Sequence, residues 1–341
     1  MILAAGRGER MQPLSDFVPK PLLFCAGLTL IERLIRSLIE AGVGKFTVGV
    51  GWKGDLVREH LTAIPEGRLI EVVDVPDYRR GPLRTLVSAL SNVGDRSFLL
   101  CPADYVVEPE TVSGLISEHT HGSGRRVITM LVDSNRQEGT PVFGHGNGLV
   151  AGIGDSAISF NHIGSSAMLL LAMRSFKADC EAALEEGSTQ VVSAINRMIT
   201  EGKPIRYALV RQPWFDVDSL SALLDANHHL LERRTSGTTG TLYVPSGQEV
   251  DWRSNIPSSI HLDAGVKVTG PTLVCESCRI ESESRIGPFA TIGPNCHVGA
   301  RTIIAESILF EQSEVPGDVT LENAAVYGQT PYRSKTRYVP Q

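Results

Sequence analysis

The sequence predicts an α/β protein in which a Rossmann-like, mostly parallel sheet with helices on both faces is followed by a C-terminal left-handed parallel β-helix. Two observations lead to this fold class. Short apolar runs alternate with segments of helical period through the first 232 residues, as in a parallel sheet wrapped by helices. From residue 256 onward, apolar residues recur every six positions instead. The 341 residues, 42% of them hydrophobic, suffice for two separate cores.

The first part of the chain opens with a strand, a helix and a second strand. Ile2 to Ala4 is apolar, residues 30–39 carry leucine and isoleucine at helical spacing, and an apolar run follows at 46–50. Further strands are expected over residues 69–73, 98–101, 127–132, 167–171 and 205–210. Further helices are expected over residues 83–90, 110–118, 175–185, 191–201 and 220–232. In such a sheet, ligands bind at the carboxyl ends of the strands.

The C-terminal part carries a hexapeptide repeat. Its six-residue spacing joins Ile256, Leu262, Val268, Val274, Ile280, Ile286, Ile292, Val298, Ile304 and Phe310. One such unit buries a single apolar side chain, so three units must form one coil and neighbouring coils must share a core. An ordinary β-meander would not keep one register over ten positions. We expect about three coils before Pro316 ends the pattern.

These patterns divide the chain into three parts. We expect a catalytic domain over residues 1–233, a linker over 234–250 with a polar start, and the β-helix over 251–330.

Composition narrows the class of partner. The formal charge is -6 and no run of lysine or arginine occurs, which argues against a nucleic-acid or membrane surface and favours small-molecule partners. There is no stretch of eighteen apolar residues and no signal-peptide pattern, so we expect a cytoplasmic protein. Cys275 and Cys278 have the spacing of a metal or redox pair, but without a second pair we interpret them as structural.

The loop after the first strand is typical of a phosphate cradle. Gly6 and Gly8 permit backbone angles closed to other residues, so that successive N–H groups turn toward one anion. Arg7, Arg10 and Lys20 add positive charge around it. The spacing lacks the third glycine of a dinucleotide fingerprint and the Gly-Lys-Ser/Thr of a P-loop.

Residues 3–23 resemble the signature of the sugar-1-phosphate nucleotidyltransferases, Leu-Ala-Ala-Gly-x-Gly-x-Arg-Met-x-Pro-Leu followed by Pro-Lys-Pro-Leu. The resemblance implies that Arg10 stabilises the pyrophosphate leaving group and that Lys20 bridges the α-phosphate and the acceptor phosphate. Ala4, Gly6, Arg7 and Gly8 would bind the nucleotide. Members usually have a few more strand residues, so we expect the strand to start before Met1.

The same resemblance implies a Mg²⁺ site made of aspartates. Asp104 follows an apolar strand where the family has its metal-binding aspartate, although a turn-capping role fits it too. Asp216 and Asp218 stand in Trp-Phe-Asp-Val-Asp, and if this segment is a strand their side chains face the same way. Carboxylate oxygens are the ligands that Mg²⁺ prefers, and the metal assists nucleotidyl transfer.

Two departures from the family pattern bear on the acceptor. Asp218 replaces a usual glycine, as in the branch that resembles inositol-1-phosphate cytidylyltransferases. The Glu-Lys-Pro whose lysine holds the sugar phosphate is missing from the corresponding stretch, 150–155. Arg84, Lys20 or Arg174 could supply that charge, and the sequence does not choose among them.

Two further segments match the positions of substrate loops in the family. His162 and Gly164 stand where the acceptor turn lies, although His162 fits equally well as an ordinary histidine. Gly81 and Thr85 stand where the base-recognition loop lies; the glycine would admit the base and the threonine could hydrogen-bond its edge.

The resulting hypothesis is a nucleotidyltransferase that joins an NTP, GTP being our first expectation, to a sugar-1-phosphate or to a cyclitol-1-phosphate such as a valienol-type phosphate. The repeat resembles the β-helix of mannose-1-phosphate guanylyltransferases. A catalytically silent, nucleotide-sugar-binding regulatory subunit is the alternative. A β-helix acyltransferase using His261 or His297 is a third interpretation. We also expect a homo-oligomer, because the end of a β-helix exposes strand edges that a partner can cover.

Overall fold

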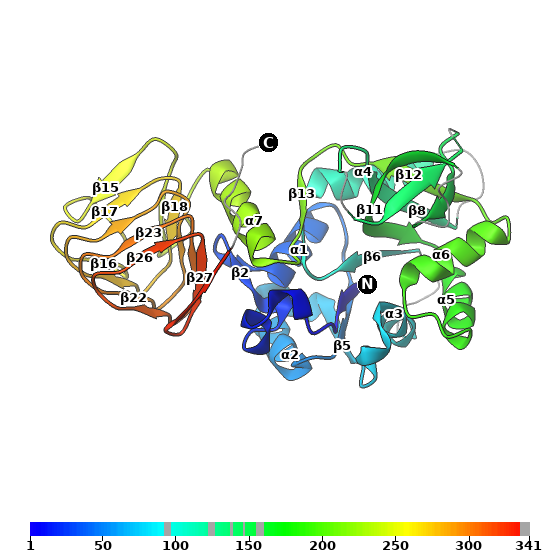
Figure 1. Cartoon of the computed structure of the whole chain (residues 1–341), viewed down its shortest axis with the longest axis horizontal. Helices are drawn as coiled ribbons and strands as arrows, with labels where there is room; N and C mark the ends of the chain where they lie inside the picture. Colours follow the sequence, from blue (N-terminus) through cyan, green and yellow to red (C-terminus); the bar gives the residue numbers. More distant parts are fainter. Residues whose placement is uncertain (92–96, 122–126, 137–138, 146, 155–159, 335–341) are drawn as a thin grey trace. The chain divides into compact units, whose positions relative to one another are not determined.

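The computed structural model describes residues 1–334 apart from 92–96, 122–126, 137–138, 146 and 155–159 (Figure 1). The chain forms two compact units. The first contains residues 1–8, 19–21 and 31–216, and the second contains residues 9–18, 22–30 and 217–341. The division into a domain that ends at residue 233, a linker that ends at residue 250 and a β-helix domain remains a prediction.

The first unit is built on a nine-stranded sheet with a parallel core. Its main order is β10-β9-β11-β6-β1-β4-β5, with β8 beside β11 and β12 beside β8. The strands are β1 (Ile2–Ala4), β4 (Phe46–Val50), β5 (Ile70–Asp74), β6 (Phe98–Pro102), β8 (Ile128–Asp133), β9 (Pro141–Gly144), β10 (Val150–Ile153), β11 (Asn161–Ala172) and β12 (Ile205–Leu209). β1 pairs in parallel with β4 and β6, and β12 with β8, whereas the long β11 is antiparallel to its neighbours. The predicted α/β class with a parallel-rich sheet is confirmed.

Helices cover this sheet. They are α1 (Leu30–Glu40), α2 (Gly54–Ala63), α3 (Pro82–Leu90), α4 (Pro109–His121), α5 (Phe176–Glu185) and α6 (Val191–Thr200). Residues of α3, α5 and α6 share one core with alternate residues of β6 and β8, namely Phe98, Leu100, Ile128, Met130 and Val132. That alternation is the two-residue period of a strand. β4 is buried at all five positions, so both faces of the sheet are covered there.

The carboxyl ends of the parallel strands define one edge of the sheet. β6 and β8 are both antiparallel to β11 and therefore run in the same direction. The loop after β1, Asp104 after β6 and Asp133 at the end of β8 thus lie at the same edge. A separate two-stranded sheet pairs β7 (Tyr105–Val107) with β13 (Trp214–Asp216). This edge is where ligands bind in open α/β sheets.

The second unit contains helix α7 (Leu220–Arg233), the short hairpin β2 (Phe24–Cys25) and β3 (Leu28–Thr29), and four coils of short strands (Figure 1). The coil strands are β16 (His261–Leu262), β17 (Lys267–Thr269), β18 (Thr272–Val274), β19 (Arg279–Ile280), β20 (Arg285–Ile286), β21 (Thr291–Ile292), β22 (His297–Val298), β23 (Ile303–Ala305), β24 (Ile308–Leu309), β25 (Glu314–Val315), β26 (Thr320–Glu322) and β27 (Ala324–Tyr327). Each strand of the first three coils pairs in parallel with the strand one coil further on, in three sheets. This stacking is consistent with the predicted parallel β-helix.

The repeat departs from the predicted register near its end. Six-residue spacing holds for the buried core positions as far as Ile304, but the next core residue is Leu309, five positions on, and it pairs with Ile292. Phe310 was expected at that position; it is buried elsewhere and packs edge-on against Tyr327. The expectation that Pro316 ends the pattern after about three coils is also wrong, because Pro316 lies between β25 and β26 of a fourth coil.

Antiparallel strands terminate the stack at both ends. β14 (Leu242–Val244) pairs with β18 and β15 (Glu249–Asp251) pairs with β17. β28 (Thr330–Arg333) folds back on β27. Part of the expected linker therefore forms strands of the β-helix.

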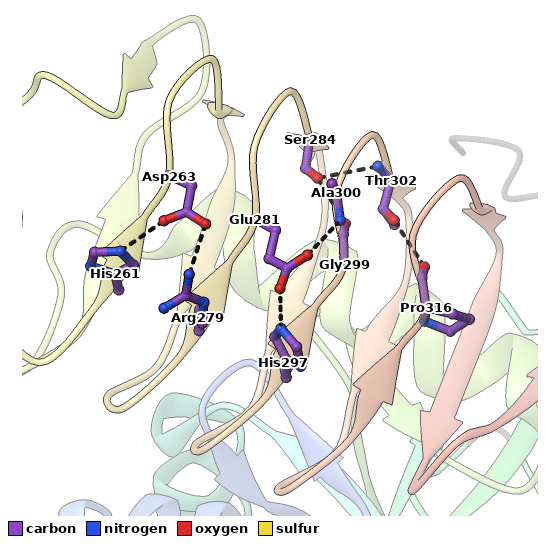
Figure 2. Close-up of polar contacts among 10 residues, drawn as sticks. All are labelled: His261, Asp263, Arg279, Glu281, Ser284, His297, Gly299, Ala300, Thr302 and Pro316. Atoms are coloured by element: carbon purple, nitrogen blue, oxygen red, sulfur yellow. Dashed lines mark hydrogen bonds and ion pairs between the residues drawn. The ribbon is translucent and has the colours of Figure 1, made fainter.

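Polar side chains link successive coils. The Ser284 hydroxyl donates to the Gly299 carbonyl, and the Thr302 hydroxyl donates to the Pro316 carbonyl, both inside the stack (Figure 2). The thiols of Cys278 and Cys296 donate in the same way to the carbonyls of Gly293 and Phe310. All six cysteines are buried free thiols, and these hydrogen bonds agree with a structural interpretation. None of the helices in the described part of the chain has the length and hydropathy that a membrane span requires.

Candidate functional site

The loop between β1 and residue 9 places a small, exposed turn at the carboxyl edge. Gly8 has φ +70°, and a Cβ at that position would lie 3.2 Å from the Cβ of Lys20. Gly6 has no left-handed φ, and a Cβ there would meet open space, so the expected special backbone angle is found at Gly8 but not at Gly6. Ala4 is buried in β1, and the Arg7 guanidinium lies 4.7 Å from the Trp52 ring centre.

Lys20 and Asp104 form the central contact of the site. Lys20 begins a 3-10 turn, Lys20–Leu22, and Asp104 follows β6. The Lys20 ammonium donates to Oδ2 of Asp104, and their side chains are only 12% and 18% exposed. The other oxygen, Oδ1 of Asp104, is buried and has no hydrogen-bond partner among the described residues. A buried carboxylate oxygen without a partner carries a desolvation cost that a bound cation would relieve.

Asp216 lies near Asp104, around the buried side chain of Tyr105. β13 is antiparallel to β7, and Asp216 stands directly opposite Tyr105. Burial raises the pKa of the Tyr105 phenol well above its ordinary value, and the carboxylates of Asp216 and Asp104 raise it further. Burial and the same two carboxylates also raise the pKa of the Cys101 thiol. Both negative charges are therefore close to the end of β6.

Asp218 has a different setting. β13 ends at Asp216, so the strand alternation expected to place Asp216 and Asp218 side by side does not extend to Asp218. The Asp218 carboxylate accepts from Arg10, within the second unit. Arg10 is 74% exposed, so this ion pair contributes little to stability.

The residues of the first unit nevertheless fit a divalent cation. Among the described residues, no group of three or more His, Cys, Asp or Glu side chains is clustered as a ready-made metal site. Mg²⁺ does not need one, because it is commonly held by one or two carboxylates together with substrate phosphates and waters. The unpartnered oxygen of Asp104 is a hard ligand of the required kind.

The structure also brings together Asp133, Trp214 and Arg136, to which the sequence assigned no role in the site. The Trp214 indole donates to Oδ2 of Asp133 at 2.8 Å. The Tyr105 ring lies 5.1 Å from the Trp214 ring, and the Arg136 guanidinium lies 4.7 Å from the Trp214 ring centre. An aspartate directly after the apolar run 127–132, at the edge where ligands bind, is the signal that could have pointed to this group.

The expected base-recognition residues have clear packing roles. Gly81 has φ +98°, and a Cβ there would lie 2.6 Å from the Thr189 carbonyl oxygen. Thr85 is 3% exposed, and its methyl group lies 2.9 Å from the point where Gly49 would carry a Cβ. Contact with a nucleobase remains a prediction for both.

The expected acceptor residues lie at the start of β11. His162 is exposed and packs edge-on against Phe143, with the ring centres 5.6 Å apart. Gly164 has φ +141°, and a Cβ there would lie 2.3 Å from the carbonyl oxygen of Asp133. Only glycine lets β11 approach the end of β8 so closely. The start of β11 therefore lies against Asp133, the residue that accepts the hydrogen bond from Trp214.

Of the three candidates for the missing phosphate charge, only Lys20 contacts Asp104. Arg84 is paired with Asp77 at 2.7 Å and lowers the pKa of that carboxyl. Arg174 follows Ala172, which stands opposite the first residue of β6, so it lies at the sheet edge away from Asp104. In the stretch expected to carry Glu-Lys-Pro, residues 150–153 form β10, and Asp155 lies outside the described residues.

The histidines considered for acyl transfer lie against carboxylates on the surface of the coils. His261 lies 2.7 Å from Asp263, and His297 lies 3.0 Å from Glu281 (Figure 2). Asp263 also accepts from Arg279 on the next coil. Their contacts are those of a charged surface that links neighbouring coils.

A parallel-rich sheet, a glycine-containing loop after the first strand and a lysine–aspartate contact at the carboxyl edge form the arrangement expected of a nucleotidyltransferase. Comparison with known families agrees. Residues 1–199 match the MobA-like NTP transferase domain, and residues 268–332 match the GMPPB C-terminal domain. The first match covers more than half of the chain, which therefore belongs to the MobA-like NTP transferase family.

Individual relatives differ in how much they share with the chain. A bifunctional IPC transferase and DIPP synthase of Rubrobacter xylanophilus is 39% identical over 116 residues, 34% of this chain and 26% of that protein. The chain thus spans about a quarter of that relative's length. A glucose-1-phosphate thymidylyltransferase of Streptomyces antibioticus is 23% identical over 344 residues, covering 96% of this chain and 91% of that one. The inositol-1-phosphate CTP transferase structure from T. maritima has a TM-score of 0.58 at 17% identity, covering 69% of this chain and 96% of that one, and shows a shared fold.

Proposed function

We propose that this protein transfers a nucleotidyl group from an NTP to a sugar-1-phosphate or cyclitol-1-phosphate and releases pyrophosphate. The observation that carries the proposal is the Lys20–Asp104 contact beside the β1 loop, with the second Asp104 oxygen buried and unpartnered. The Lys20 ammonium can bind a phosphate, and the unpartnered oxygen of Asp104 can bind a metal ion.

The reaction needs charge stabilisation and geometry more than covalent assistance. An oxygen of the acceptor phosphate attacks the α-phosphorus in line, and the bond to pyrophosphate breaks. In this proposal the loop of residues 5–8 binds NTP phosphates through backbone N–H groups, and Lys20 moves from Asp104 to the α-phosphate and the acceptor phosphate. Arg10 keeps the role that the family resemblance implies, stabilising the charge of the leaving pyrophosphate.

Mg²⁺ is the proposed metal, with Asp104 and Asp216 as its protein ligands. When bound, it neutralises phosphate charge and acts as a Lewis acid on the α-phosphate. Asp218 remains a proposed third ligand, although in the described structure its carboxylate pairs with Arg10.

The acceptor is proposed to be a cyclitol-1-phosphate, such as a valienol-type phosphate, ahead of a hexose-1-phosphate. Asp218 in place of glycine and the missing Glu-Lys-Pro support this preference. A solved structure with the same fold is named an inositol-1-phosphate CTP transferase, which supports testing this acceptor class first. GTP stays the first NTP to test, because the C-terminal segment matches the GMPPB C-terminal domain. His162, Gly164, Gly81 and Thr85 stay proposed substrate contacts.

We also propose a homo-oligomer, and a cytoplasmic location remains a prediction. Among the described strands, β25 and β26 end their sheets without a partner on the outer edge, and such edges favour association. Static light scattering of the full chain tests this: a mass of one chain would contradict it.

The test of function is pyrophosphate release with Mg²⁺, crossing the four NTPs with glucose-1-phosphate, mannose-1-phosphate, inositol-1-phosphate and valienol-1-phosphate. Release with one pair above all others is the expected result and identifies both substrates. No release with any pair, while a nucleotide-sugar still binds in calorimetry, would overturn the transferase in favour of the silent regulatory subunit.

A further inference from the structure

The proposed reaction requires a cation for the acceptor phosphate, and the usual lysine is missing. Lys20 is proposed to be shared between the α-phosphate and the acceptor phosphate, Arg84 is paired with Asp77, and Arg174 lies at the far edge of the sheet. A phosphate group carries up to two negative charges into a site that already contains Asp104 and Asp216. Mg²⁺, Arg10 and Lys20 are shared with the phosphates of the NTP, so a cation at the carboxyl edge that serves the acceptor phosphate alone would take the place of the missing lysine.

Arg136 is at that edge and is held in place from two sides. It follows β8 by three residues, and its guanidinium lies 4.7 Å from the centre of the Trp214 ring. That ring is fixed by its hydrogen bond to Asp133 and by its contact with Tyr105. The backbone carbonyl of Arg136 accepts from the buried hydroxyl of Ser165 on β11 at 3.1 Å.

The Trp214 contact places Arg136 on the same side as the carboxylates. Trp214 and Asp216 are two apart in strand β13, so their side chains lie on one face, and Tyr105 stands opposite Asp216 on β7. The rings of Tyr105 and Trp214 are in contact, and Arg136 lies over the Trp214 ring, so Arg136 and Asp216 flank the same pair of rings.

The chemistry of the contact leaves the guanidinium able to bind a ligand. An arginine stacked on an aromatic face keeps the N–H donors at its edge available for a phosphate, which they can bind in a bidentate fork. Among the described residues, no carboxylate forms an ion pair with Arg136. By contrast, Nε of Arg84 lies 2.7 Å from the Asp77 carboxylate, so Arg84 is already paired with an anion.

We propose that Arg136 binds the phosphate of the acceptor and takes the place of the lysine in Glu-Lys-Pro. This inference rests on the proposed function. It assigns the acceptor phosphate to the space beside Trp214 and gives Asp133 a positioning role, since Asp133 holds the ring on which Arg136 lies.

The test compares Arg136→Met with Arg136→Lys in steady-state kinetics of the best substrate pair. Methionine keeps an apolar stem that can pack on Trp214 but removes the charge. We expect Arg136→Met to raise KM for the acceptor phosphate roughly 10- to 100-fold with the KM for NTP within about 2-fold, and Arg136→Lys to recover part of the loss. Arg253→Met is the matched control, because Arg253 lies over Trp252 with the same 4.7 Å separation but in the second unit.

Two results distinguish a wrong assignment of Arg136 from a wrong proposed function. If the wild-type protein turns over but Arg136→Met leaves the acceptor KM unchanged, or raises both KM values equally, the assignment of Arg136 is overturned and the proposed function stands. If the wild-type protein neither turns over nor binds any acceptor phosphate in calorimetry, both are overturned. Near-UV circular dichroism that matches the wild type shows that the tryptophan environment is intact in the variants.

Discussion

Asp104 is the residue of the candidate site whose two carboxylate oxygens have different surroundings. One of its oxygens accepts from Lys20 and the other is buried without a partner among the described residues. Such a group destabilises the free protein by an amount that its ligand recovers on binding. The family resemblance predicted both residues, and the structure adds that they contact each other.

Asp104→Asn should lower kcat by about 100-fold or more, because an amide is a poor Mg²⁺ ligand. Pyrophosphate release at saturating substrates measures the effect, and thermal unfolding checks the fold. Glu110→Gln, at an exposed position in the first turn of α4, is the control and should retain full activity. A fully active Asp104→Asn protein would contradict the metal assignment.

Lys20→Met should destabilise the protein by about 1–3 kcal/mol, because it leaves a mostly buried carboxylate without its cation. Adding Asp104→Asn should recover part of this loss, since the remaining amide carries no charge. Urea unfolding of the two single variants and the double variant gives the coupling. Simple additivity of the two free-energy changes would show that the ion pair does not contribute to stability.

At the scale of elements, the structure follows the strongly periodic parts of the sequence. α1 and most sheet strands lie where apolar spacing predicted them, but α2 was missed because only Val57 and Leu61 are buried on it, too few to form a periodic stripe. The Phe310 error has a different cause: one residue is missing from a coil, and only strand pairing reveals it. The Asp133–Trp214–Arg136 group joins residues about 80 positions apart, so finding it requires the sheet topology.

Gly164→Ala tests how β11 meets β8. The substitution should destabilise the protein by about 2–4 kcal/mol, because the new Cβ would lie 2.3 Å from the Asp133 carbonyl oxygen and φ is +141°. Gly114→Ala within α4 is the control, with open space around its Cβ, and should stabilise by about 0.5–1 kcal/mol. Denaturant unfolding measures both. Equal effects would mean that the close approach of the two strands is not required.

At the scale of the whole molecule, the second unit combines segments from both ends of the sequence. Asn227 on α7 is 1% exposed, and its Oδ1 accepts from the Ala26 backbone N–H and from the Thr291 hydroxyl. Its Nδ2 donates to the Phe289 carbonyl. One amide therefore connects the N-terminal hairpin, α7 and the coils within this unit.

His228, one residue further on, should make stability depend on pH. Burial lowers its pKa to about 4. Because the unfolded chain keeps the ordinary value, it binds the proton more readily, and stability falls as the pH drops from 6.5 to about 4. Within this range, each unit of decrease in pH lowers the free energy of unfolding by up to about 1.4 kcal/mol. Asp225, which lines the same small cavity, acts in the opposite sense because burial raises its pKa.

The measurement is the unfolding free energy of the wild type and of His228→Gln between pH 7 and pH 4. The difference between the two isolates the histidine from Asp225, and it should change by about 3 kcal/mol in favour of the variant at low pH. A pH-independent difference would contradict a buried neutral imidazole.

The antiparallel strands β14, β15 and β28 cover the edges of three strands of the β-helix, β18, β17 and β27. The edge of a parallel coil exposes a row of N–H and C=O groups that can pair with a strand of the same chain or of another molecule. A stack whose edges are uncovered can therefore grow into a fibre by adding further molecules. β28 occupies the edge of β27 with a strand of opposite direction. The four residues Thr330–Arg333 thus close one of the three sheets to a further parallel strand, and their loss would leave all three sheet edges at this end of the stack open to strand addition.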